Sequence, residues 1–229
     1  MLRIFVAGIL FVLTTPVFAV AGSQTYSSPG THTFTVPAYG SLTVKAWGGG
    51  GGGGGITDAS ITGAGEGGDS SFQNVRAGGG LGALPHDAGV SVAGVGGAGG
   101  IASGGDINID GNSGQNGNPY DPISGAGGDA PNGGSGGHSA RSLEGGHPGS
   151  PPGGGGGGGG GADVGPDPEA YFAGGGGSGA YAERTFYINQ LSAGVSIPVN
   201  VGGGGVGGFG GIPSVPGGAG APGRVSITW

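Results

Sequence analysis

Apolar and polar residues alternate in two neighbouring stretches near the N-terminus. In residues 30–36, Phe34 and Val36 alternate with threonines, and in residues 41–47, Leu42, Val44 and Ala46 alternate with more polar side chains. A period of two places successive side chains on opposite faces of a β-strand. Residues 37–40 (Pro-Ala-Tyr-Gly) separate the stretches, so the pattern predicts a hairpin.

The same pattern returns near the C-terminus. Residues 179–205 read as a second pair of strands, joined around 190–194, and in the closing stretch Val225, Ile227 and Trp229 share one face. A lone hairpin is only marginally stable in water, so we expect the strands of both chain ends to pack together. The predicted fold is a small antiparallel β-sheet or sandwich, built from about 24–47 and 178–229.

Between these strands the chain is dominated by glycine. Gly accounts for 69 of the 229 residues, and the long glycine runs occupy 48–55, 78–80, 153–161, 174–177 and 202–205. Elsewhere glycine recurs every third residue, as in the series Gly96, Gly99, Gly105, Gly111, Gly114 and Gly117 and the series Gly125, Gly128, Gly134, Gly137, Gly146 and Gly149. Three residues per turn is the polyproline-II period, which rises about 3.1 Å per residue.

Two structures of the insertion at 48–177 are compatible with this composition: a disordered tether and an ordered bundle. Ordering a residue costs about 1–2 kcal/mol, and a backbone hydrogen bond returns about 1 kcal/mol, so an isolated run stays disordered. Only 8% of the residues are charged, whereas disordered chains usually carry high net charge. We therefore expect a bundle of left-handed polyglycine-II helices clamped by the strands, with no α-helix in residues 22–229.

The first residues have the features of an export signal. Arg3 precedes an apolar stretch at 4–17, and Ala19-Val20-Ala21 matches an A-x-A cleavage site. We expect cleavage after Ala21, which leaves a single domain at 22–229. The apolar stretch is shorter than the roughly 20 residues that span a bilayer, and no second one follows. The predicted location is extracellular or on the cell surface, with no membrane span after cleavage.

Charge and composition disfavour several classes of function. The formal net charge is −7, and an acidic chain does not neutralise a phosphate backbone, which argues against nucleic-acid binding. The chain has no cysteine, so an exported domain must be held without disulfides. "GGSGG" at 133–137 fits a nucleophile motif, but in so glycine-rich a chain such matches arise by chance. We expect a protein that is not an enzyme and needs no cofactor.

Two polar patterns suggest weaker alternatives. Asp106, Asn108 and Asp110 match the first half of a calcium loop, but its twelfth position is Gly117 instead of Glu. A short strand or a glycine-helix turn with its polar face in water is the simpler interpretation. No metal site is therefore predicted, and calcium binding by these three residues is kept only as the weaker alternative. The threonines of 31–35 suggest an ice-binding array, although the solvent face of a strand is the simpler interpretation.

Short segments without long glycine runs are the candidates for recognition. They contain Pro and Asp, lie at 81–87, 118–123, 138–148, 163–172 and 209–216, and read as turns between glycine segments. Loops on a rigid scaffold often carry binding residues, and aromatic side chains are favoured contacts. The candidate ligand contacts are Tyr120, Asp121, His138, His147, Tyr171 and Phe172. The alternative is that they pack over the edges of the bundle.

The order of these segments resembles a known family. "FTVP" and "LTVKAWGGGGGGGG", followed by "GSGAYAERTFYI", "GVSIPVNVGGGG" and the final "GRVSITW", are similar to the glycine-rich domain of phage tail proteins and tail-tip adhesins. The resemblance covers essentially all of 22–229. It implies a small β-sheet carrying a polyglycine-II sandwich whose far loops contact cell-surface receptors. The export signal differs from phage structural proteins and favours a secreted or surface-exposed bacterial relative.

The sequence therefore predicts an exported adhesin-like module. Its partner would be a cell-surface glycan or an outer-membrane protein, and self-association is left open. A structural protein of an extracellular matrix or coat is the main alternative, and an ice-binding protein is the third.

Overall fold

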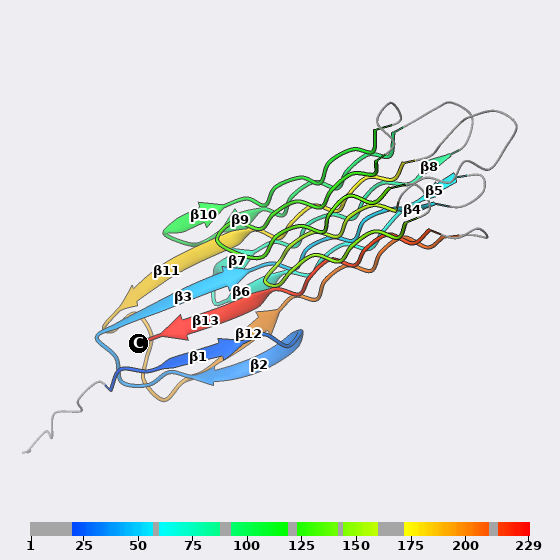
Figure 1. The fold of residues 1–229 in the computed structure, drawn as a ribbon. Coiled ribbons are helices and arrows are strands. Elements are labelled where there is room, and N and C mark those ends of the chain that lie inside the picture. Colours follow the sequence, from blue (N-terminus) through cyan, green and yellow to red (C-terminus); the bar gives the residue numbers. More distant parts are fainter. Residues whose placement is uncertain are drawn as a thin grey trace, which may run out of the picture.

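The computed structural model describes residues 20–56, 60–87, 93–118, 123–141, 144–159, 172–210 and 215–229. These residues form β-strands and long extended segments, with no helix among them. In this part of the chain no helix is long and apolar enough to cross a membrane. Most of the strands lie at one end of an elongated molecule, and the extended segments run from them to the other end (Figure 1).

Two five-stranded antiparallel sheets form a sandwich. The first sheet has the order β1 (Ser23–Tyr26), β13 (Arg224–Thr228), β3 (Ser41–Trp47), β11 (Tyr181–Tyr187) and β10 (Ile107–Ile109). The second has the order β2 (Gly30–Thr35), β12 (Ser196–Val201), β6 (Ser70–Phe72), β7 (Val75–Ala77) and β9 (Ala102–Ser103). The mainly β, antiparallel architecture agrees with the sequence prediction, but β6, β7, β9 and β10 come from the glycine-rich insertion.

The inward-facing positions of the alternating stretches fill the core of the sandwich. Phe34 from β2 and Leu42 and Val44 from β3 are almost completely buried. The ring of Phe72 on β6 packs edge-on against Phe34 and Phe186, with 5.9 Å between the centroids in each pair. Because every second side chain of each strand points inward, the period-two pattern identifies this core correctly.

The predicted hairpins are wrong in their pairing. β2 is hydrogen-bonded to β12, and β3 is hydrogen-bonded to β11 and β13, so residues 30–47 cross from one sheet to the other. β11 and β12 cross in the same way. The alternation specifies which side chains face the core, but two strands that face each other across a sandwich show the same alternation as two strands paired in one sheet.

The two crossings lie against each other at the outer end of the sandwich. Val36 N donates to Val195 O at 2.9 Å, Gly194 N donates to Val36 O at 2.8 Å, and Ile188 N donates to Gly40 O at 3.1 Å. Beside them is a cavity of about 470 Å³ with Tyr39, Ile188 and Leu191 in its lining. The end remote from the glycine segments is thus closed by backbone contacts between two turns that are distant in sequence.

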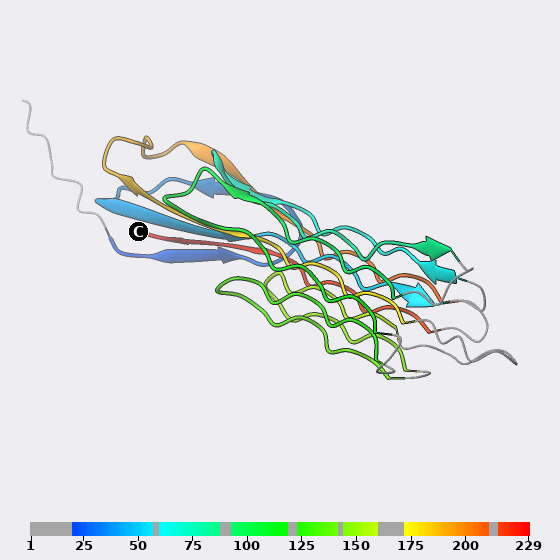
Figure 2. The same ribbon diagram turned by 90° about the horizontal axis from the view of Figure 1, so that it is seen from above.

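The glycine-rich residues form the second half of the molecule, which we call the glycine bundle. Figures 1 and 2 show its segments running side by side away from the sandwich. The described segments are 48–56, 62–69, 78–84, 93–101, 110–118, 123–130, 133–141, 144–150, 152–159, 172–180, 202–210 and 215–223. A small third sheet, β4 (Gly55–Ile56), β5 (Ser60–Thr62) and β8 (His86–Asp87), lies at the far end.

Segment 48–56 lies in the centre of the bundle and bonds to neighbours on every side. Successive N–H groups of 49–54 donate to three segments in rotation, at 2.8–3.0 Å: 62–69, 215–223 and 172–180. The carbonyl groups of the same residues accept, at the same distances, from three others: 78–84, 202–210 and 152–159. Each partner recurs at every third residue, so one turn of this backbone uses all its hydrogen-bonding groups laterally.

Segments 152–159 and 172–180 are also interior, and the three interior segments bond to one another. Gly51 N donates to Gly177 O, Gly176 N donates to Gly156 O, and Gly156 N donates to Gly51 O. The described residues of all three segments are buried. The described residues of the runs 48–55, 153–161 and 174–177 are therefore enclosed by neighbours, whereas Gly204 of the run 202–205 is exposed.

The spacing of the segments explains why the interior runs carry no side chains. A Cβ atom built on Gly49 would lie 2.0 Å from the carbonyl oxygen of Gly203. The corresponding distance for Gly53 is 2.0 Å, to the oxygen of Gly157. Because no real Cβ approaches a backbone oxygen so closely, a residue larger than glycine at either position would push two segments apart and break their hydrogen bonds.

Buried serines replace backbone partners inside the bundle. Ala140 N donates to Ser124 Oγ at 2.6 Å, and Ser124 Oγ donates to Gly158 O at 2.7 Å. Asn112 N donates to Ser178 Oγ at 2.8 Å. Each hydroxyl therefore pairs a buried backbone group that would otherwise lack a partner, a condition that buried polar groups almost always meet.

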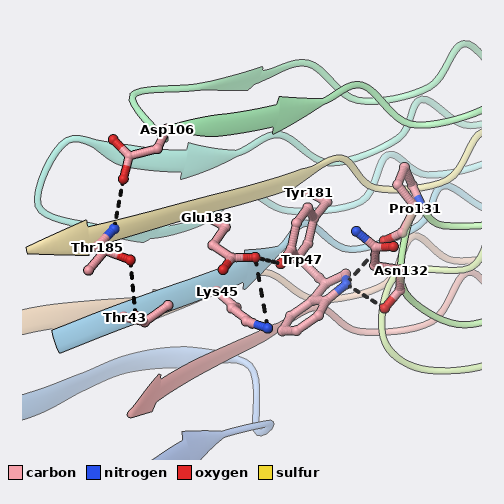
Figure 3. Close-up of polar contacts among 9 residues, drawn as sticks. All are labelled: Thr43, Lys45, Trp47, Asp106, Pro131, Asn132, Tyr181, Glu183 and Thr185. Carbon is pink, nitrogen blue, oxygen red and sulfur yellow. Dashed lines mark hydrogen bonds and ion pairs between the residues drawn. The ribbon is translucent and has the colours of Figure 1, made fainter. Parts of the chain in front are cut away.

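Trp47 joins the sandwich to the bundle (Figure 3). Its indole Nε1 lies 3.1 Å from the carbonyl oxygens of both Pro131 and Asn132, in the turn that follows segment 123–130. Its ring packs on Tyr181 of the neighbouring strand, with 5.0 Å between the centroids. The Tyr181 hydroxyl donates to Glu183. Burial, and then the adjoining Glu183 carboxylate, raises the pKa of Tyr181 above its ordinary value.

Candidate recognition site

Residues that flank the segments poor in glycine meet at the far end of the bundle. β5 pairs with β4 and β8 there, and Ile56 forms a bridge with Val215. Further bridges join Ala93 to Phe172, and Ile123 to both Asn118 and Arg141. A small apolar cluster of Ile56, Ile61, Ala173 and Val215 closes this end. The candidate site is therefore the far end, opposite the sandwich.

The structure tests half of the predicted contact residues. Tyr120, Asp121 and Tyr171 lie outside the described residues. Phe172 is only 1% exposed, and its carbonyl oxygen accepts a hydrogen bond from Gly94 N at 2.8 Å. In this structure the Phe172 ring therefore packs inside the bundle, as an aromatic residue beside an interior glycine run can do.

The two predicted histidines lie side by side. His138 is in segment 133–141 and His147 in segment 144–150, and their ring centroids are 6.3 Å apart. His147 Nε2 is 3.7 Å from Glu144 Oε1, and Arg141 N donates to the same carboxylate at 3.2 Å. Both imidazoles are exposed, so this polar group lies on the side of the bundle and is accessible to a ligand.

Phe209 is an exposed aromatic residue that the sequence prediction missed. Its side chain is 81% exposed, the highest value among the large apolar residues described. Its carbonyl oxygen accepts a hydrogen bond from Thr62 Oγ1 of β5, which fixes the backbone there. Its outward direction could have been predicted from its three-residue spacing from Val206, which is also exposed. Two outward positions one turn apart thus bring an exposed ring to the far end.

Asp106, Asn108 and Asp110 lie far from this site, in and beside β10 at the sandwich. Asp106 Oδ2 accepts from Thr185 N at 2.9 Å, and Asp110 Oδ1 accepts from Ala102 N at 2.8 Å. Asn108 bonds to both backbone groups of Gly105. Within the described ranges, no three His, Cys, Asp or Glu side chains are grouped to hold a metal ion. The three side chains bind backbone groups around β10.

The threonines of β2 bond to the neighbouring strand. Thr31 Oγ1 donates to Asn200 Oδ1 at 2.7 Å, and Thr35 Oγ1 lies 3.4 Å from Ser196 Oγ, both on β12. These are cross-strand pairs on the outer face of the second sheet. At Thr31 and Thr35 the hydroxyl groups therefore contribute to strand pairing.

Comparison with known proteins adds no relative to this description. No protein-family model matches the chain, and neither a curated protein nor a solved structure does.

Proposed function

We propose that this protein is an exported, non-enzymatic binding module whose glycine bundle holds a recognition surface away from the sandwich. The segments of the bundle would be polyglycine-II helices, and the far end would contact a cell-surface glycan or outer-membrane protein. The observation that carries the proposal is the backbone of 49–54, whose N–H and C=O groups all bond sideways. A backbone fixed in this way can act as a rigid support for variable segments.

Two further observations favour recognition at the far end. The segments that contain Pro, Asp and aromatic residues are flanked by residues that meet there, and the Phe209 side chain is exposed there. Exposed aromatic side chains supply much of the binding energy at protein interfaces. Stacking on a sugar ring or insertion into an apolar pocket would both use such a residue. Export through the N-terminal segment would place the module outside the cell.

A structural role in a matrix or coat is the second candidate. It is favoured by exposed apolar residues along the side of the bundle, such as Leu81 and Ile101. In that role the molecules would associate through their sides, and no selective ligand would be needed.

Binding of the mature chain to whole cells and to a glycan array tests the first candidate. We expect selective binding that falls about tenfold or more in Phe209→Ala, Tyr120→Ala or Tyr171→Ala, the range found for interface hot spots. Val206→Ala is the matched control, because it removes an exposed apolar side chain one turn nearer the sandwich. Absence of selective binding, or equal loss in the control, would refute recognition at the far end.

A further inference from the structure

Two adjacent segments of the bundle present apolar side chains on one side. In segments 78–84 and 93–101 the outward positions recur every third residue and hold Leu81, Leu84, Val95, Ala98 and Ile101. The large residues among them are 41–67% exposed. We call these five residues the apolar face. A contiguous apolar patch of this kind usually marks an interaction surface.

The side chains of the apolar face are paired across it, large with small at Leu81 and Ala98 and large with large at Leu84 and Val95. Leu81 N donates to Ala98 O at 2.8 Å, and Leu84 N donates to Val95 O at 3.1 Å, so each pair lies at one level along the bundle. Nearer the sandwich, Ile101 is 67% exposed. Beside it is a hollow of about 260 Å³ over Gly78 and Gly79. The face therefore carries both a projecting side chain and a depression next to it.

At the level of Leu81 and Ala98, the two borders of the apolar face differ in charge. On one side, segment 62–69 presents Glu66 and Asp69, and the Asp69 carboxylate is bound by Arg76 and by Gly79 N. Glu66 is exposed. On the other side, segment 110–118 presents Ser113 at this level and Asn116 beyond it, and its one carboxylate, Asp110, lies at the sandwich end, where it accepts from Ala102 N. Asn116 Oδ1 accepts from Gly96 N, which holds this side chain against the face.

We propose that the apolar face binds the same face of a second copy of this chain, through a two-fold axis parallel to the bundle. A two-fold axis in this direction leaves the position of each residue along the bundle unchanged. It places segment 78–84 of one copy opposite segment 93–101 of the other. Leu81 would face Ala98 of the second copy, and Ile101 would face the hollow over Gly78. Leu81 and Ile101 would then each meet a small residue or the hollow, Leu84 would meet Val95, and the same patch would serve both copies, as a two-fold interface requires.

The position of Glu66 on the border of the apolar face favours a two-fold axis parallel to the bundle. With the axis parallel to the bundle, Glu66 faces the segment of the second copy that contains Ser113, whose hydroxyl can donate to a carboxylate. The backbone pairs place these residues at one level, because Gly67 N bonds to Gly80 O and Gly114 N bonds to Gly97 O. An axis across the bundle would instead place Glu66 opposite Glu66, and like charges in close contact are unfavourable.

This dimer goes beyond the proposed function and does not depend on it. Because the axis runs along the bundle, both far ends would point in the same direction. Two recognition sites held on one side could then engage a surface together, which raises apparent affinity without any new contact.

Sedimentation of the mature chain over a range of concentrations tests the dimer. We expect a reversible dimer, and we expect Leu81→Asp and Ile101→Asp to raise its dissociation constant about tenfold or more, because each change occurs twice in the interface. Val206→Asp is the control, since Val206 is also outward and 66% exposed but lies on another side of the bundle. Unfolding midpoints close to that of the parent would show that the variants fold.

Single cysteines test the direction of the axis, since the chain has no cysteine of its own. In a mixture of Glu66→Cys and Ser113→Cys, oxidation should yield the mixed 66–113 disulfide and little 66–66 product. A monomer at every concentration would overturn the proposal. So would a dimer that Val206→Asp weakens as much as Leu81→Asp does, or predominant 66–66 crosslinking.

Discussion

A Cβ atom added to Gly52 would lie 2.0 Å from the carbonyl oxygen of Val206, and one added to Gly203 would have a single neighbour, at 3.9 Å. Both residues belong to glycine runs in the sequence, yet only Gly52 is enclosed by other segments. At the scale of residues, the bundle thus contains two kinds of glycine: those whose neighbours leave no room for a Cβ atom, and those where a Cβ atom would fit. The difference depends on neighbours distant in sequence, so composition alone does not reveal it.

Alanine substitutions at these two positions should differ strongly in their effect on stability. We expect Gly52→Ala to lower the free energy of unfolding by about 3 kcal/mol or more, because the added methyl group must displace a backbone segment. Gly203→Ala should change it by no more than about 0.5 kcal/mol. Urea unfolding of the three proteins measures both values. Equal effects at the two positions would contradict the close packing of the interior segments.

Tyr181 should make stability depend on pH in the alkaline range. Its pKa is raised in the folded protein, by burial first and by Glu183 second. In the unfolded chain the phenol ionises near its ordinary value of about 10. The unfolded state therefore loses its proton first, so this contribution to stability is constant below about pH 10 and is lost as the pH rises further.

The free energy of unfolding, measured from about pH 8 to about pH 11, tests this dependence. We expect it to fall above about pH 10, and we expect a shallower fall in Tyr181→Phe. Burial also raises the pKa of Tyr26, so part of the slope should remain in the variant. An unchanged slope would show that Tyr181 ionises equally in both states.

At the scale of elements, the two crossings at the outer end of the sandwich depend on one hydroxyl group. Tyr39 Oη lies 3.1 Å from the carbonyl oxygens of Tyr187 and Leu191, and it accepts a hydrogen bond from Leu191 N at 2.8 Å. The Tyr39 side chain is buried. It therefore ties the turn between β2 and β3 to the turn between β11 and β12.

Removing this hydroxyl should destabilise the sandwich. We expect Tyr39→Phe to lower the free energy of unfolding by about 1–3 kcal/mol, because buried backbone groups of the second turn lose their partner. Tyr187→Phe is the control, since Tyr187 is exposed. Thermal or urea unfolding would compare the two. A loss in Tyr187→Phe as large as in Tyr39→Phe would argue against a specific role of the buried hydroxyl.

Sequence patterns predicted the elements better than their partners. Alternation identified the inward positions Phe34, Leu42 and Val44, because side-chain direction is a local property of a strand. It did not reveal that β2 and β3 belong to different sheets, since pairing depends on β11 and β12, far along the chain. The strands β6 and β7 were missed because each is three residues long and lies among glycines.

The candidate site was only partly predictable for a related reason. His138 and His147 are close because their two segments lie side by side. The sequence suggested this proximity only because both residues belong to the segment 138–148. Whether an aromatic residue is exposed depends on the neighbouring segments. The Phe172 side chain is buried in the bundle and the Phe209 side chain is exposed, although both residues lie close to glycine runs.

At the scale of the whole molecule, the sandwich and the bundle are stabilised by different interactions. The sandwich has an ordinary apolar core, which brings both ends of the chain together. The bundle gains almost nothing from side chains in its interior and relies on backbone hydrogen bonds between segments. Because the three interior segments bond to one another and to the outer segments, we expect the bundle to be lost cooperatively.

Amide hydrogen exchange of the glycine residues tests this account most directly. The N–H groups of residues 49–54 and 154–158 are all hydrogen-bonded and buried, so we expect them to exchange only through global unfolding, with protection equal to that of the β3 core. Nuclear magnetic resonance of the mature chain with labelled glycine would resolve them. Exchange of these amides at the rate of an unstructured Gly/Ser linker, while β3 stays protected, would contradict a rigid bundle and the functions proposed on it.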